Sequence, residues 1–320
     1  MEGTREICRQ GDTGADGTVL VYGNINIDIT LYVEELPRPG LETLASRILR
    51  SGGGSAANTA VALSRLGVPA SILGCVGTDT GGREALKDLE IEGVDTTHVK
   101  RADAPTGRVY VIVDARGERT MIAFRGANNL MSPDTIDADA VTRALWVHVS
   151  GGKRDVGLEI LELASKAGIP TSYDPGRAAY GAPKYEIAPL LERTDVLLVN
   201  ELELNALRSR SLPLPGIVVV KLGARGSKIL VNSDVISAPA FNVRVIDTTG
   251  AGDAFNAGFI AGLSYGLSLN ETLIFANAVA AMKVAKEGAR SSPALKEVIA
   301  FLQRSGHRDL ARRILSIGVP

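Results

Sequence analysis

DTTGAGD, residues 247–253, is the stretch that decides the fold, and a run of small and apolar residues, 254–262, follows it directly. Glycine reaches backbone angles that other residues avoid, so Gly250 and Gly252 allow a tight turn whose amide groups converge on one point. A helix expected to begin near Asp253 adds free N–H groups and the positive end of its dipole, which suits the turn to phosphate. Asp253 itself has two interpretations here, a helix N-cap or a carboxylate that works at the anion site.

Two further segments have the composition of ligand-binding loops. SGGGSAANTA, residues 51–60, leads into a helical pattern, and its glycines allow close approach of a ligand while Asn58 offers a donor and an acceptor. Asn200 and Glu203 follow the apolar run 196–199, at the end of an expected strand where open α/β sheets bind ligands. An Asn and a carboxylate there could hold hydrated magnesium or its phosphates.

Taken together and in this order, the three segments resemble the ribokinase-like (PfkB) family of carbohydrate and nucleoside kinases. The resemblance extends from the strand that begins at Val19 to about Ser292. It implies an α/β fold with an open, mostly parallel sheet, helices on both faces and a small β lid over the sugar. It also implies transfer of the γ-phosphoryl group of ATP to a hydroxyl of a sugar or sugar derivative, with Mg²⁺ as cofactor.

The composition fits a globular chain without a strong overall charge. Of 320 residues 45% are hydrophobic, and 35 basic against 36 acidic residues leave a net charge of −1, which indicates neither nucleic acid nor a membrane surface as a partner. No segment reaches the roughly 20 apolar residues of a membrane span. Cys8 and Cys75 show no sign of pairing, which favours the cytoplasm.

Several other site types are missing from the sequence. The three histidines are scattered and form no zinc-ligand pattern, and neither a Walker A motif nor the third glycine of a dinucleotide fingerprint is found. Residues 1–17 lack a signal-peptide core and are expected to form a flexible polar tail before a kinase domain at 18–320.

Apolar runs that alternate with helix-length segments along the chain support the same architecture. Apolar runs at 19–22, 70–75, 145–149, 171–173, 196–199 and 217–221 are separated by helix-length segments, the pattern of right-handed βαβ units. Segments 29–49 and 106–124 depart from it, and the second contains two β-rich runs around a polar turn. By the resemblance, these two segments form the discontinuous lid, and a homodimer through the lid is one expectation because its edge is rich in β-strand.

The resemblance assigns roles residue by residue on the acceptor side. Asp253 matches the catalytic base, and the amides of Gly250, Ala251 and Gly252 match the anion hole. The residues that match sugar contacts are Asn26, Asp28, Gly53, Gly54, Asn58 and Asn128. Asp28 could instead be a turn residue, and Asn128 equally suits a plain turn.

On the nucleotide side, Asn200 and Glu203 match a motif that acts through magnesium-bound water. The matches to nucleotide-contacting positions are Lys221, Gly223, Gly226 and Asn277, although Lys221 could be merely solvated and Asn277 a surface or capping residue. Many relatives also bind a monovalent cation beside the anion hole. Positions that match this K⁺ site are Asp247, Thr249, Lys283, Lys286, Gly288 and Ser292.

One departure bears on the acceptor. Ser150 stands where ribokinases carry a sugar-contacting glutamate, and Ser55 stands where they carry a lysine, which argues against free ribose. Nearby Arg125, Lys153 and Arg154 suit a sugar that carries phosphate or carboxylate, or else they are solvated surface charges. A nucleoside kinase, a non-catalytic nucleotide-binding homologue and a donor such as ADP remain open alternatives.

Overall fold

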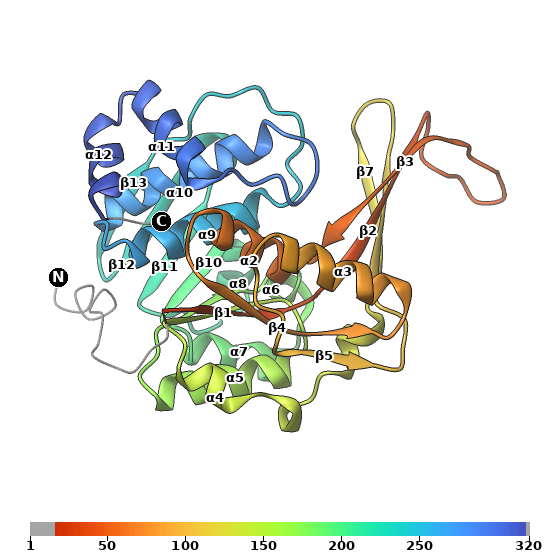
Figure 1. Ribbon diagram of the computed structural model, residues 1–320, viewed down its shortest axis with the longest axis horizontal. Coiled ribbons are helices and arrows are strands. Elements are labelled where there is room, and N and C mark those ends of the chain that lie inside the picture. The colour runs from red at the N-terminus through yellow and green to blue at the C-terminus, as the bar shows by residue number, and fades with distance from the viewer. Residues whose placement is uncertain (1–16, 318–320) are drawn as a thin grey trace.

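A nine-stranded sheet lies at the centre of the computed structural model, which describes residues 17–317 (Figure 1). The strands from β5 to β11 pair in parallel, and β12 and β13 add an antiparallel edge. In spatial order they are β13 (Asp234–Ala238), β12 (Ser227–Val231), β11 (Ile217–Lys221), β10 (Val196–Asn200), β9 (Thr171–Asp174), β8 (Trp146–Ser150), β1 (Val19–Gly23), β4 (Ala70–Gly77) and β5 (Val99–Ala102).

Helices cover both faces of this sheet, which explains why its central strands are apolar throughout. One face and its core carry α2 (Ser55–Arg65), α3 (Thr80–Ile91), α9 (Ala251–Ser264), α10 (Leu269–Val284), α11 (Leu295–Arg304) and α12 (Arg308–Ser316). The opposite face carries α4 (Ala138–Thr142), α5 (Arg154–Lys166), α6 (Ala178–Gly181), α7 (Lys184–Glu192) and α8 (Glu201–Ser209). The layers are those of a doubly wound α/β fold.

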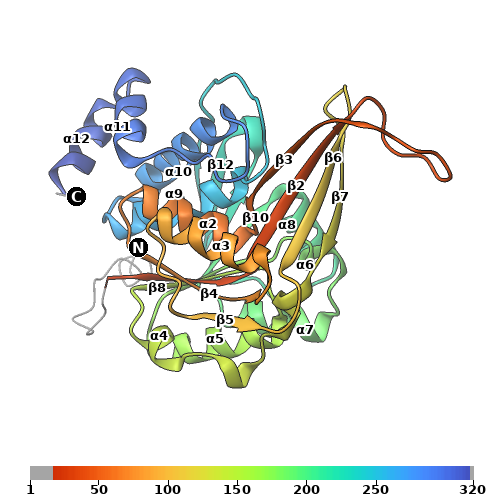
Figure 2. The same cartoon turned by 45° about the vertical axis from the view of Figure 1, so that its right-hand side comes forward.

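A four-stranded sheet, called here the small sheet, projects from one side of this body (Figure 2). Its order is β3 (Ala45–Gly53), β2 (Asn26–Val33), β6 (Gly107–Val113) and β7 (Arg119–Phe124). The β2 and β6 strands pair in parallel, while both outer pairs are antiparallel. Two stretches far apart in the sequence therefore build one sheet, and these stretches overlap the 29–49 and 106–124 segments expected for a lid.

The predicted fold class, an open and mostly parallel sheet with helices on both faces and a small β sheet beside it, is confirmed. Strand order reverses beside β1, whose neighbours are β4 on one side and β8 on the other. Such a switch point is where open α/β sheets bind ligands, at the carboxyl ends of the strands. The expected polar tail lies outside the described residues except for Gly17, and within 17–317 no helix is long and apolar enough to cross a membrane.

Candidate active site

Polar side chains end four neighbouring parallel strands at the carboxyl edge of the large sheet. Ser150 ends β8, Asp174 ends β9, Asn200 ends β10 and Lys221 ends β11. Ser150 lies beside Asp174 in the strand register, and Asn200 lies beside Lys221. Two of the predicted nucleotide-side residues, Asn200 and Lys221, are thus brought to one edge.

The glycine turn before α9 has the shape expected of an anion site. Gly250 has a φ of 76° and is the N-cap, so α9 begins at Ala251. The Ala251 amide donates to the Thr248 carbonyl over 3.2 Å and the Ala254 amide to the Gly250 carbonyl over 2.9 Å, which leaves the amides of Gly252 and Asp253 without helical partners. A Cβ on Gly250 would lie 2.3 Å from the Ala289 carbonyl oxygen, which no side chain tolerates. The N-cap interpretation of Asp253 is therefore wrong: Asp253 lies in the first turn, and Gly250 caps the helix.

Asp253 lies against the first turn of α2. The Asn58 amide donates to Asp253 Oδ2 over 2.8 Å, a contact between residues 195 positions apart. Burial raises the pKa of Asp253 to about 6, and hydrogen bonds from Asn58 and Ser55 act in the opposite direction. A carboxyl with this pKa is ionised at neutral pH and still basic enough to take a proton.

Asp28 lines a cavity of about 360 Å³ between the small sheet and the 247–249 loop. Its Oδ1 is buried and has no hydrogen-bond partner, and burial raises the pKa of the carboxyl to about 6. Gly53 pairs in the strand register with Asn26, two residues before Asp28, and a Cβ on Gly53 would lie 2.0 Å from Asp28 Oδ1. The glycine leaves room for this carboxylate, which is prepared to accept hydrogen bonds from a ligand hydroxyl.

Asn26 and Asn128 join the small sheet to the body of the protein. The Asn128 amide donates to Asn26 Oδ1 over 2.9 Å, while its own oxygen accepts the backbone amide of Ile25 over 3.0 Å. Asn128 is 4% exposed, so its contacts are structural whatever else it binds. Gly54, with a φ of 94°, packs on Asn24 and caps α2.

Arg290 is a site residue that the sequence does not reveal. Its guanidinium donates to the Gly53 carbonyl over 2.9 Å and to Asn58 Oδ1 over 3.2 Å, and it also pairs with Asp88. It thereby fixes two of the predicted sugar-contacting residues from a loop more than 230 positions away. An arginine among the polar residues 286–292 carries no motif that would single it out.

A second unforeseen group surrounds Lys221. The Lys221 ammonium donates to Asp174 Oδ2 over 2.8 Å and to Asn256 Oδ1 over 3.2 Å. Burial alone would lower the pKa of Lys221, but Asp174 and Glu203 outweigh it and raise that pKa. Lys221 is therefore a held cation, not a freely solvated one, and its Nζ lies 3.6 Å from where a Cβ on Gly252 would stand.

Asn200 and Glu203 form a capping box at the start of α8. The backbone N–H of Glu203 donates to the side-chain Oδ1 of Asn200, and the backbone N–H of Asn200 donates to Glu203 Oε2, both over 2.8 Å. Burial raises the pKa of Glu203, and the neighbouring Asp174 carboxylate adds to the effect. These contacts fix the carboxylate in place through Oε2 and leave Oε1 outside the capping box.

The remaining nucleotide-side residues divide into two kinds. Gly223, with a φ of 59°, would meet nothing within 4 Å if it carried a Cβ, so a ligand has room there. A Cβ on Gly226 would lie 2.1 Å from the Ala238 carbonyl oxygen, so Gly226 serves packing between two strands. Asn277 donates to the Ala238 and Pro239 carbonyls, each over 3.1 Å, which gives it a packing role.

The Asp247 loop is crowded with hydrogen-bond donors. Asp247 Oδ1 accepts the Thr249 amide over 2.9 Å, and Oδ2 accepts the Gly288 amide over 3.0 Å. Arg119, at the start of β7, donates to Asp247 Oδ1 over 3.2 Å and also to the hydroxyls of Thr248 and Thr249. Burial would raise the pKa of Asp247, but the hydrogen bonds from Thr249 and Gly288 and the nearby Lys283 charge outweigh it and lower that pKa.

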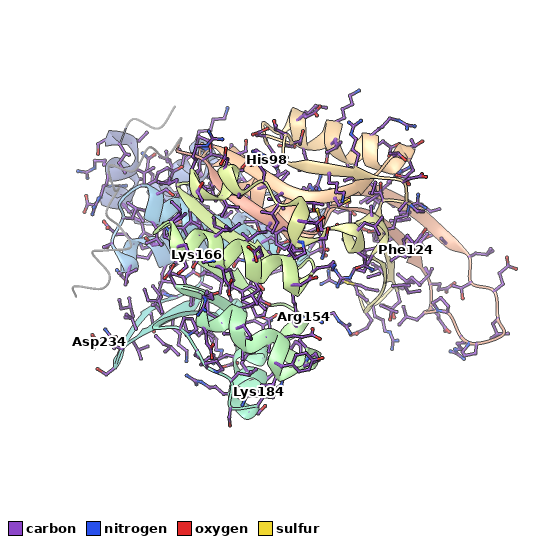
Figure 3. All side chains as sticks on the ribbon, turned by 90° about the horizontal axis from the view of Figure 1, so that it is seen from below. His98, Phe124, Arg154, Lys166, Lys184 and Asp234 are labelled. Carbon is purple, nitrogen blue, oxygen red and sulfur yellow. The ribbon has the colours of Figure 1, made fainter. Side chains whose placement is uncertain are left out.

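A cavity of about 600 Å³ lies beside Asn24 and carries the three predicted cations, Arg125, Lys153 and Arg154. Asp155 pairs with Lys153 over 3.2 Å, and Glu186 pairs with Arg154, so the lining keeps an excess of one positive charge. Figure 3 shows Arg154 at one end of α5 and Lys166 at the other. The Asn24 carbonyl abuts Gly54, which places this cavity next to the predicted sugar-binding glycines.

Comparison with known proteins supplies the family. The model of the pfkB family carbohydrate kinases matches residues 16–296. An ATP-dependent ribose-1-phosphate kinase of Halopiger xanaduensis is 39% identical over 89% of this chain and 97% of its own length. A nucleoside kinase of Methanothermobacter thermautotrophicus is 30% identical over 87% of this chain and 92% of its own length.

Solved structures agree with the sequence match. The crystal structure of ribokinase from Thermotoga maritima superposes with a TM-score of 0.81 at 30% identity, covering 89% of this chain and 99% of that one. The predicted likeness to ribokinase-like kinases is therefore confirmed over most of the chain. The chain belongs to the pfkB family of carbohydrate kinases and is a phosphotransferase that acts on a sugar or nucleoside hydroxyl.

Proposed function

We propose that this kinase phosphorylates a sugar that already carries a phosphate group, with a pentose phosphate such as ribose 1-phosphate as the acceptor. The cationic cavity of Arg125, Lys153 and Arg154 beside the sugar site carries this proposal. Arginine grips a phosphate with two parallel hydrogen bonds, and Arg125 is exposed to solvent beside the cavity. The relative that is 39% identical is named for the same substrate.

The acceptor hydroxyl that lies against Asp253 gives its proton to this carboxylate. Its oxygen then bonds to the γ-phosphorus of ATP, and the bond from that phosphorus to the leaving ADP oxygen breaks. The amides of Gly250 and Gly252 face the charge on the transferring group, and the dipole of α9 adds to them. The Ala251 amide, which donates to the Thr248 carbonyl over 3.2 Å, holds the turn in shape. Asp28, whose buried oxygen lacks a partner, holds a sugar hydroxyl.

Magnesium fits the donors near the strand ends. Glu203 and Asp174 are close enough to influence each other's charge, and hard oxygen ligands of this kind suit Mg²⁺ that keeps its waters. We assign the contact to Glu203 through water, with the ion supplying charge neutralisation on the phosphates when bound. Lys221 and the open backbone at Gly223 lie where the nucleotide phosphates would approach.

We also propose that the small sheet acts as a lid and joins two copies of the chain. Across the sheet, Ile48, Leu31 and Ile112 lie in register on one face. On the same face of β7, Ile122 is 59% exposed and Phe124 49% exposed. A contiguous apolar face on an open sheet marks a contact surface, and a second copy offers the same face around a two-fold axis.

An acceptor panel tests the substrate. Ribose 1-phosphate, ribose 5-phosphate, ribose, fructose and adenosine are compared by kcat/KM with saturating ATP and Mg²⁺. A phosphorylated pentose should be best, and free ribose should be about 10- to 150-fold poorer, as expected for losing a hydrogen bond to a charged group. A neutral sugar or a nucleoside as the best acceptor would contradict the proposal.

The cationic cavity is tested by Arg125→Ala. It should raise KM for the phosphorylated acceptor about tenfold, because a charged hydrogen-bonding pair is lost, and leave KM for neutral fructose unchanged. Lys166→Ala removes an exposed cation at the far end of α5 and serves as the matched control. Equal effects of Arg125→Ala on charged and neutral acceptors would remove the cavity from the site.

A further inference from the structure

We infer that the side-chain ammonium of Lys283 takes the place of the monovalent cation expected beside the anion hole, so that this kinase needs no K⁺. The inference rests on the proposed anion hole at Gly250–Gly252. Lys283 is the penultimate residue of α10, its side chain is fully buried, and its Nζ donates to the Asp247 carbonyl over 2.8 Å. The ammonium thus reaches the loop from which the glycine turn starts.

The oxygens that a K⁺ ion would need are already engaged. Each of the three oxygens of Asp247 accepts a hydrogen bond, and two of the donors, Lys283 and Arg119, are cationic. On the other half of the expected site, the carbonyls of Lys283, Gly288 and Ser292 accept bonds from Lys286, Ser291 and Arg65 respectively. Because a second cation there would meet two positive groups and few free oxygens, the donor set does not fit K⁺.

The same contacts explain what the ammonium does for catalysis. The Val284 carbonyl accepts the amides of Ile246 over 2.7 Å and Asp247 over 3.1 Å, so Lys283 and Val284 at the end of α10 together hold the 246–247 segment. Fixing Asp247 fixes the turn that follows, because the Thr249 amide is bound to the Asp247 carboxylate. Lys283 is therefore a positioning residue: it touches neither substrate nor reacting atoms, and through Asp247 it holds the anion-hole amides in their orientation.

The charge of the ammonium is supported by its surroundings. Burial lowers the pKa of Lys283, and the carboxylates of Asp247 and Asp253 act against that change, while Arg119 acts with it. A buried cation that donates to a carbonyl and interacts electrostatically with two nearby carboxylates is in the arrangement that a bound metal ion would otherwise create. Covalent attachment makes this cation independent of the salt composition of the solution.

The first measurement compares wild-type turnover in KCl with turnover in choline chloride at equal ionic strength and saturating Mg²⁺. Turnover should be the same in both salts, and a severalfold stimulation by K⁺ would overturn the inference. This measurement needs no variant, and the kinase itself remains active in either outcome, so the proposed function is judged separately.

The second measurement uses a variant that lacks the Lys283 ammonium. Lys283→Ala should lower kcat about 10- to 100-fold in choline chloride, somewhat less than the loss of an oxyanion-hole donor. KCl or NH₄Cl should then restore much of the activity and raise the melting temperature of the variant, neither of which a purely structural role predicts. Lys283→Met, which keeps the volume but not the charge, should stay slow in every salt.

Lys296→Ala, an exposed lysine of α11, is the control and should behave as wild type in every salt. If Lys283→Ala does not fold in choline chloride, Lys283→Ser takes its place. Salt-independent melting and turnover of the small-residue variant would show that no cation can replace the ammonium, and the inference would be wrong.

Discussion

At the scale of a single residue, Asp253 links the two sides of the site. Its carboxyl lies in the first turn of α9, beside the amides proposed for the anion hole, and it accepts a hydrogen bond from Asn58 of α2. Burial keeps its pKa at about 6 instead of 3.8. This value allows the carboxylate to be ionised before the reaction and to hold a proton during it, which is what a general base requires.

Asp253→Asn should lower kcat about 100- to 10,000-fold, because the amide keeps the shape and the contact with Asn58 but cannot take a proton. Nucleotide affinity, measured by calorimetry, should stay as in wild type. Full turnover in a correctly folded Asp253→Asn protein would remove Asp253 from the role of base.

The pH dependence of turnover and of stability tests the role of Asp253 in two further ways. With neutral fructose as acceptor, whose charge does not change near pH 6, wild-type kcat/KM should rise with pH through about 6. A carboxyl whose folded pKa lies above its unfolded value costs stability as pH rises from about 4 to 6, and this cost remains at higher pH. Asparagine carries no such cost, so at pH 8 the melting temperature of Asp253→Asn should equal or exceed that of wild type.

At the scale of elements, local patterns predict what local forces determine. The runs 196–199 and 217–221 became β10 and β11 within one residue, because buried parallel strands must be apolar on both faces. Asn200 and Glu203 satisfy each other three residues apart, so a sequence motif suffices to find them. The antiparallel β12 and β13 edge was not predicted, since short half-exposed strands give a weak signal.

One contact joins an element of the lid to the anion turn. Arg119 at the start of β7 donates to Asp247, Thr248 and Thr249 and is 31% exposed. Arg119→Ala should lower kcat/KM about tenfold, the lower end of the range for charged hydrogen bonds because solvent screens the pair. Hydrogen exchange should become faster in 114–124 when substrates are bound.

The matched control for this contact is Arg116→Ala. Arg116 lies on the same hairpin turn, its side chain is 84% exposed, and it pairs with Asp114 of its own turn. The Arg116→Ala substitution should change neither kcat/KM nor hydrogen exchange in β7. Equal behaviour of the two variants would mean that the contact of Arg119 does not hold the lid.

At the scale of the whole molecule, the contacts that sequence reasoning missed are those between residues distant in the chain. Lys283 reaches Asp247, 36 positions away, and Arg290 reaches Asn58, 232 positions away. The sequence placed Lys283 only among the positions that match a K⁺ site and did not single out Arg290, because Lys and Arg are seldom buried without a partner. Only the packing of α10 and the following loop against α2 and the glycine turn shows that these cations are held inside.

The proposed lid surface leads to a prediction about the assembly of the molecule. Ile122→Asp places a charge in the middle of the apolar face formed with Ile48 and Ile112, and the same change occurs twice in a two-fold interface. The wild-type protein should therefore have twice the 33.6 kDa mass of one chain, and Ile122→Asp should have the mass of a monomer. Analytical ultracentrifugation and gel filtration measure both. Ile91→Asp, at a 73% exposed apolar position on α3 away from the lid, should remain a dimer. A wild-type monomer at micromolar concentration would refute the lid as a dimer interface, and the apolar face would then need another occupant.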